Sequence, residues 1–157
     1  MEFKFTEENL QKVHEAMKKY PKPQAAVMPA LYIAQGQNGY ISYEVMKEVA
    51  LQLGMDSEDV LGVASFYTMF HKKEAGKYHI QVCTNISCML RGGYDIWKAV
   101  MEKLDIKNGE TIPDKKFSLE EVECMGACGG APMVAVNDDY YENLTKEKVL
   151  EIIESLK

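Results

Sequence analysis

The sequence lacks several features that would each indicate a particular class of protein. Its 157 residues include no apolar run long enough to cross a membrane. The opening residues have neither the basic start nor the apolar core of a secretory signal peptide. We therefore expect a cytoplasmic protein that has no membrane span of its own.

Positive charge and nucleotide-binding motifs are also scarce. The chain has 18 basic and 24 acidic side chains, for a net charge of -6, and no dense basic patch interleaved with aromatic residues. Such a chain repels phosphate backbones, so nucleic acid is not an expected partner. Neither a dinucleotide fingerprint nor a P-loop is present, which excludes the common nucleotide sites.

Cysteine is confined to two short stretches. Four residues separate Cys83 from Cys88, and three separate Cys124 from Cys128. Two close pairs of thiols can form disulfides, bind zinc or ligate an iron-sulfur cluster. A reducing cytoplasm disfavours disulfides, and a chain of this length with 46% hydrophobic residues can bury a core without them.

The spacing favours a cluster while leaving the other uses of the thiols open. Structural zinc sites mostly use pairs separated by two residues, although wider spacing occurs. A thioredoxin-type dithiol enzyme also needs two intervening residues, which neither pair has. A cluster needs backbone N-H groups close to its sulfurs, and small side chains permit that approach. The flanking small residues are Thr84, Ser87, Gly126, Ala127, Gly129 and Gly130.

Residues 1–73 are predicted to be helical throughout. Thr6 and Ser42 are suitable N-caps for amphipathic stretches, and Ser57 is expected to open a further helix that ends in aromatic residues. The helix between the first two contains Pro29, which predicts either a kink or a late start. We expect a helical bundle here.

Residues 74–157 show the periodicities of both strands and helices. Alternation after position 77 predicts a strand that ends at Cys83, and a second strand is expected to end at Cys124. Helices are predicted over about 96–104 and after Thr145, with a β-hairpin at 133–141 between them. The fold class is α+β, with a helical extension preceding an α/β domain.

The remaining charged groups have simpler interpretations. The acidic residues Glu120, Glu121 and Glu123 are expected at a solvated strand edge, where their charge would lower the potential of a nearby cluster. The histidines His14, His71 and His79 have no evident partners, so they are not expected to be ligands.

Several stretches together resemble one protein family. They are residues 78–91, 109–114, 122–133 and 137–142, joined in the helical part by 31–35, 39–42 and 64–70. They are similar to the small iron-sulfur protein of NADH:quinone oxidoreductase, which is the E subunit of respiratory complex I. The resemblance extends over nearly the whole chain.

The resemblance implies a fold and a cofactor. It implies that residues 74–157 form a thioredoxin-like [2Fe-2S] ferredoxin domain and that residues 1–73 form a helical bundle for partner docking. One [2Fe-2S] cluster per chain would be ligated by the four cysteines Cys83, Cys88, Cys124 and Cys128. It also implies a cis peptide bond before Pro132.

The resemblance further implies a function that depends on other subunits. The chain would be an electron-transfer subunit of an NADH dehydrogenase, without catalytic residues of its own. FMN and NADH would be bound by a partner flavoprotein, with further iron-sulfur subunits nearby and the membrane reached only through the complex. The alternatives are the equivalent subunit of an NAD-linked hydrogenase or formate dehydrogenase, a zinc-stabilised docking module, and a thiol oxidoreductase.

Overall fold

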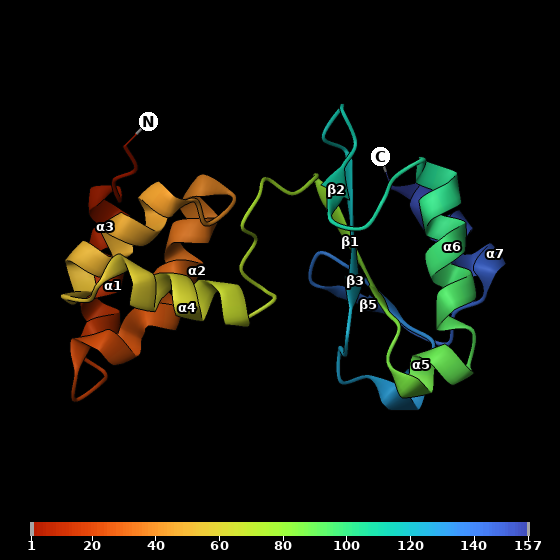
Figure 1. Cartoon of the computed structure of the whole chain (residues 1–157), viewed down its shortest axis with the longest axis horizontal. Helices are drawn as coiled ribbons and strands as arrows, with labels where there is room; N and C mark the ends of the chain where they lie inside the picture. The colour runs from red at the N-terminus through yellow and green to blue at the C-terminus, as the bar shows by residue number, and fades with distance from the viewer. Residues whose placement is uncertain (1, 157) are drawn as a thin grey trace. The chain divides into compact units, whose positions relative to one another are not determined.

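A computed structural model describes residues 2–156, and the chain divides into two compact units, Met1–Glu74 and Ala75–Lys157. Figure 1 shows the helices and strands of both units. No helix within residues 2–156 combines the length and the apolar character needed to span a bilayer.

The first unit consists of helices, as predicted. Its elements are α1 (Glu7–Met17), a 3₁₀ turn (Pro23–Ala26), α2 (Val27–Asn38), α3 (Tyr43–Leu53) and α4 (Ser57–Phe66). The Thr6 and Ser42 side chains accept hydrogen bonds from backbone N-H groups in the first turns of α1 and α3, which confirms both as N-caps.

Two further details of this unit agree with the sequence prediction. Pro29 lies in the first turn of α2, where its missing N-H would have no partner within the helix, because α2 starts late, at Val27. Ser57 is the first residue of α4, as predicted, and Asp56 is the N-cap residue.

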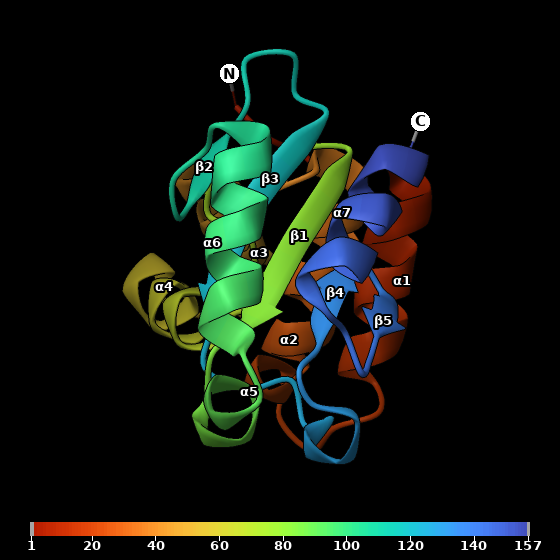
Figure 2. The ribbon, with the colours of Figure 1, turned by 90° about the vertical axis from the view of Figure 1, so that its right-hand side faces the viewer.

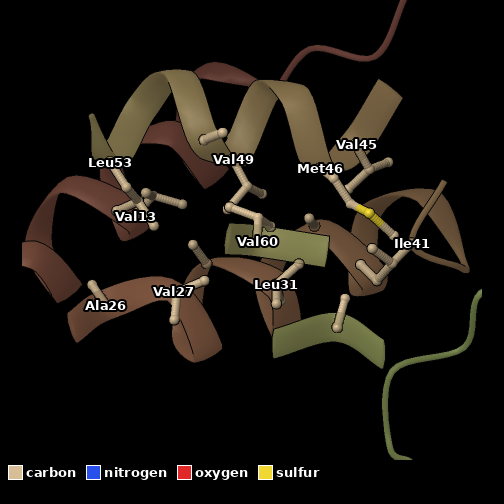
Figure 3. Close-up of a cluster of buried hydrophobic side chains, with 14 of the residues drawn as sticks. Val13, Ala26, Val27, Leu31, Ile41, Val45, Met46, Val49, Leu53 and Val60 are labelled. Atoms are coloured by element: carbon tan, nitrogen blue, oxygen red, sulfur yellow. The ribbon is translucent and has the colours of Figure 1, made fainter. Parts of the chain in front are cut away.

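The core of the first unit is formed by apolar side chains from all four of its α-helices. Figure 3 shows how these side chains point toward one another between the helices. Fully buried members include Val13 of α1, Leu31 of α2, Val49 of α3 and Val60 of α4. The unit therefore has a hydrophobic core of its own, composed of residues before position 75.

The second unit is built on a five-stranded sheet. The strands are β1 (Tyr78–Cys83), β2 (Glu110–Thr111), β3 (Phe117–Val122), β4 (Val134–Val136) and β5 (Asp139–Tyr141), in the order β2-β3-β1-β4-β5. β1 is central and pairs parallel with β3 and antiparallel with β4. β4 and β5 form the predicted hairpin.

Three further helices belong to this unit. They are α5 (Ile86–Leu90), α6 (Gly93–Leu104) and α7 (Lys146–Ser155). α6 and α7 pack together on one face of the sheet, and β1 passes behind them in Figure 2. The alternating residues Ile80 and Val82 of β1 join the core between these helices and the sheet.

The prediction for this unit was wrong or incomplete in three places. α5 and β2 were not predicted, because elements of five and two residues are too short to show a periodicity. The acidic residues Glu120 and Glu121 lie past the two residues of β3 that pair with β2, but they are less solvated than predicted. Glu120 and Glu121 are half-buried there and have hydrogen-bond partners.

Candidate metal centre

The parallel pairing of β1 and β3 brings the two cysteine segments together. Neighbouring parallel strands end at the same edge of a sheet. Cys83 is the last residue of β1 and is paired in register with Val122, the last residue of β3. Cys124 follows Val122 by two residues, so both segments start from one point at this edge.

The other two cysteines are presented by short helical turns at the same edge. Cys88 lies in α5, and Cys128 opens a 3₁₀ turn, Cys128–Gly130. Figure 2 shows α5 and this turn beyond the carboxyl end of β1. All four cysteines line one cavity of about 210 Å³. The structure thus gathers every predicted ligand around a single space.

The two cysteine pairs differ in their exposure to solvent. Cys83 and Cys88 are buried, whereas Cys124 and Cys128 are exposed. Burial, together with a hydrogen bond to Cys83, raises the pKa of Cys88 to about 11. Without a metal, Cys88 is therefore a protonated thiol at neutral pH, which is unfavourable for a nucleophilic enzyme thiol.

Backbone hydrogen bonds fix the first cysteine segment to its neighbours, and one backbone N-H of the second segment donates to a cysteine sulfur. The Cys83 N-H donates to the Met133 carbonyl at 3.4 Å, and the Thr84 N-H donates to the Val122 carbonyl at 3.2 Å. The Gly126 N-H donates to Cys124 Sγ at 3.3 Å. Gly126 has a φ of 74°, a conformation that favours glycine, so the residue type and the hydrogen bond are linked.

A second glycine lets α6 approach the first cysteine pair. A Cβ atom on Gly93 would lie 2.9 Å from the backbone carbonyl carbon and oxygen of Cys88 and 3.0 Å from the Cys83 carbonyl oxygen. Those separations are too short for ordinary packing. Glycine at position 93 therefore allows the first turn of α6 to contact the backbone of both cysteines.

A carboxylate lies beside the loop that follows Cys83. The Thr84 hydroxyl donates to Glu121 Oε1 at 2.7 Å, and the Glu121 N-H donates to Asn108 Oδ1 at 2.9 Å. Thr84 is buried, so this hydrogen bond is shielded from much of the solvent. The contact ties the first cysteine segment to β3.

The donor set and the space it surrounds fit a two-iron cluster. A [2Fe-2S] cluster is ligated by four cysteine thiolates spread over two irons. The cavity of about 210 Å³ is many times the roughly 10–15 Å³ that a cavity needs to hold one water, so it has room for a core of several atoms.

Two apolar residues of the site were not named as site residues by the sequence analysis. Ile86 and Met133 also line the cavity, and they lie in the stretches 78–91 and 122–133 that carry the family resemblance. His79 was not expected to be a ligand. Its Nδ1 lies 2.8 Å from Ser118 Oγ and its Nε2 lies 3.2 Å from Glu120 Oε2, so it links β1 to β3. The peptide bond between Ala131 and Pro132 is cis, which confirms that expectation.

Comparison with known sequences gives consistent relatives. Residues 13–157 match the family described as thioredoxin-like [2Fe-2S] ferredoxin. The chain is 48% identical over 158 residues to the E subunit of NADH-quinone oxidoreductase from Rickettsia conorii, covering 99% of this chain and 95% of that protein. It is also 48% identical to the mitochondrial NADH dehydrogenase [ubiquinone] flavoprotein 2 of Dictyostelium discoideum, covering 99% of this chain. The chain spans only 64% of that longer relative.

Comparison with solved structures supports the fold. An NAD+-reducing [NiFe]-hydrogenase in the H2-reduced state matches with a TM-score of 0.69 and 16% sequence identity. The match covers 81% of this chain and 22% of the hydrogenase chain. At this identity the likeness concerns the fold alone.

Proposed function

Because this chain belongs to the thioredoxin-like [2Fe-2S] ferredoxin family, we propose that it is the electron-transfer subunit of an NADH-oxidising complex. Cys83, Cys88, Cys124 and Cys128 would ligate one [2Fe-2S] cluster. The observation that carries this proposal is the convergence of all four thiols on one cavity at the edge where β1 and β3 end.

The residues around the cavity have distinct tasks in this proposal. When bound, the cluster supplies one-electron chemistry. Cys83 and Cys88 are buried, so the side of the cluster that they would ligate is kept away from water. The Gly126 N-H offsets negative charge on Cys124 Sγ. The high pKa of Cys88 means that this thiol loses a proton when it binds metal.

The chain needs a partner for the rest of the reaction. Its sequence has no dinucleotide fingerprint, so NADH and FMN would be bound by a flavoprotein that exchanges electrons with this chain. The printed names of the relatives, an E subunit and a flavoprotein 2 of NADH-oxidising enzymes, support this assignment. Further iron-sulfur subunits would complete the path, and the chain would reach the membrane only through the complex.

The first unit would dock the partner. Its core is satisfied within residues 2–74, yet Phe66 at the end of α4 and Tyr32 of α2 are exposed. Exposed aromatic residues of this kind are enriched where proteins bind one another. The helical unit is accordingly proposed as a docking module rather than a second redox site.

The cluster is tested on the purified chain. We expect about two irons and two acid-labile sulfides per chain, with an EPR signal after reduction. Cys88→Ser should abolish or alter this spectrum, whereas Ser87→Ala, beside it on the cavity wall, should preserve it. A colourless protein that contains zinc would overturn the proposal in favour of a structural metal module.

The type of complex is tested by the partner. Stoichiometric copurification of this chain with the NADH-oxidising subunits of a quinone reductase is the expected result. Copurification with a hydrogenase or formate dehydrogenase catalytic subunit would instead assign the equivalent place in one of those complexes.

A further inference from the structure

The segment that carries Cys124 and Cys128 has little regular structure of its own. β3 ends at Val122, and from there to the 3₁₀ turn that begins at Cys128 the chain forms bends and irregular loop. Both cysteines are exposed, so burial does not fix them as it fixes the first pair. The conformation of this loop, residues 123–127, therefore depends on hydrogen bonds.

Strand β5 and the residues after it supply contacts of this kind. The Tyr140 hydroxyl donates to the Met125 carbonyl at 3.1 Å, across 15 residues of the chain. Further along, the Asn143 N-H donates to the Gly130 carbonyl at 2.6 Å. The second cysteine segment is thus attached to residues 140–143 both between its two cysteines and after the second one.

Tyr140 reaches the loop because of its position in the strand. It pairs with Ala135 of β4, and its neighbour Tyr141 packs against the core between the sheet and the helices. Successive side chains of a strand point to opposite faces of a sheet, so Tyr140 points away from that core. Its side chain is 51% exposed. Burial of the ring therefore does not explain this residue, whereas the hydroxyl contact gives it a defined partner.

The hydrogen bond from Tyr140 is made to a peptide group that also contacts a cysteine sulfur. The Met125 carbonyl and the Gly126 N-H belong to one peptide unit, which is planar and rigid. The Tyr140 hydroxyl holds the carbonyl end of this unit, while the N-H end donates to Cys124 Sγ at 3.3 Å. Fixing one end of a rigid plane restricts the direction of the other. Hydrogen bonds in a chain also polarise one another, so a donor at the carbonyl strengthens the N-H as a donor.

We propose that Tyr140 is a positioning residue for the cluster, because its hydroxyl orients the peptide group between Met125 and Gly126 so that the N-H is directed at Cys124 Sγ. This inference rests on the proposed function, since it concerns a ligand sulfur of that same site. One-electron reduction adds negative charge to a cluster, and hydrogen bonds to its sulfurs help to set its potential. A donor to a ligand sulfur stabilises the more negative, reduced form, so Tyr140 raises the reduction potential.

The test uses the full chain loaded with its cluster. Tyr140→Phe keeps the ring and removes the hydroxyl, so the equilibrium constant for one-electron reduction should fall by roughly two- to tenfold, the effect expected for one hydrogen bond. For a one-electron couple, this fall makes the midpoint potential about 20 to 60 mV more negative. A redox titration monitored by EPR measures the shift, and the iron content of the variant should equal that of the wild type.

Tyr141→Phe is the matched control. It removes a hydroxyl from the next residue of the same strand, on the opposite face of the sheet, and should leave the potential unchanged. Equal potentials of Tyr140→Phe and the wild type would overturn the proposal, because water at the exposed carbonyl would then replace the hydroxyl. An equal shift in both variants would also overturn it, since the effect would not come from the contact with Met125.

A second measurement follows the peptide group itself. Without the hydroxyl, the Gly126 amide should exchange its hydrogen with solvent faster than in the wild type, as measured by mass spectrometry of peptides covering residues 124–128 from the full chain. Unchanged exchange would show that Tyr140 does not restrain this group, and would overturn the proposal.

The outcomes also separate this inference from the proposed function. A wild-type chain that carries no [2Fe-2S] cluster contradicts the proposed function itself. A wild-type chain that carries the cluster, with a potential that does not respond to Tyr140→Phe, contradicts only the role of Tyr140.

Discussion

The hydrogen bond from Thr84 to Glu121 links a cysteine segment to a charge. Thr84 follows Cys83 directly, and Glu121 lies on the neighbouring strand. The bond restrains the loop, and the carboxylate places negative charge near the cysteines, which would disfavour the reduced form of a cluster. A single side-chain contact could thus influence both the stability of the loop and the redox potential.

Replacing Thr84 tests the stabilising part of this contact. Thr84→Val keeps the shape of the side chain but removes the donor, so the half-buried carboxylate of Glu121 loses a partner. We expect the free energy of unfolding to fall by roughly 1–3 kcal/mol, measured by denaturant titration of the cluster-free protein. Thr84→Ser retains the hydroxyl and serves as the control. Equal stability of the two variants would contradict the prediction.

Single residues also show where sequence reasoning reached its limit. The four cysteines were identified as candidate ligands because their spacing is visible in the sequence. The partners of Glu120 and Glu121 were not foreseen, because they lie on strand β1 and in the loop that follows it. The parallel register between β1 and β3 brings these groups together, and this register cannot be read from the sequence.

At the scale of elements, α6 depends on glycine for its close approach to the cysteine segments. Gly93→Ala would place a methyl group against the backbone of Cys83 and Cys88. Helix propensity alone would favour alanine by about 1 kcal/mol, so steric conflict and propensity act in opposite directions. Backbone atoms on the opposing side cannot rotate away as a side chain can, so the conflict should prevail.

The prediction for Gly93→Ala is faster loss of the cluster and lower stability than the wild type, measured by the decay of visible absorbance in denaturant. Gly62→Ala in α4 is the matched control, because no atom other than those of its chain neighbours and its own helix backbone lies within 4 Å of its Cβ position. That control should be neutral or stabilising by up to about 1 kcal/mol. If the visible absorbance of Gly93→Ala decayed no faster than that of the wild type, the prediction would be wrong. The backbone of Cys83 and Cys88 would then be able to move away from the added methyl group.

Elements differed in how well the sequence predicted them. α1, α3 and α7 have a hydroxyl side chain at the N-cap and a regular apolar stripe, and each begins where expected. α5 has five residues, and it contains a cysteine where a loop was predicted. Asn85 is its N-cap, and α5 packs against α6, a tertiary contact that no local pattern reveals.

At the scale of the whole molecule, the two units have separate hydrophobic cores. One core is formed by residues from Phe5 to Phe70, and the clusters of the second unit begin at Ile80. A unit that has its own core can in principle fold alone. Binding of a cluster and docking of a partner should therefore be separable along the chain.

Expression of residues 75–157 alone tests this separation. We expect the fragment to show the same visible and EPR spectra as the full chain but to bind the flavoprotein partner more weakly, because the docking helices are missing. Iron analysis and a binding titration measure the two properties. A fragment that cannot retain the cluster would show that the first unit is needed to complete the fold of the second.

The order of the strands has a practical consequence for attaching the protein to other materials. The turn between β2 and β3 lies at the end of the sheet remote from α5 in Figure 2, and Asp114 and Lys115 there are exposed. A linker to an electrode or a fluorophore joined at this turn would leave the cysteine end of the sheet unobstructed. In the second unit, the turn available for attachment and the cysteine cavity therefore lie at opposite ends of the sheet.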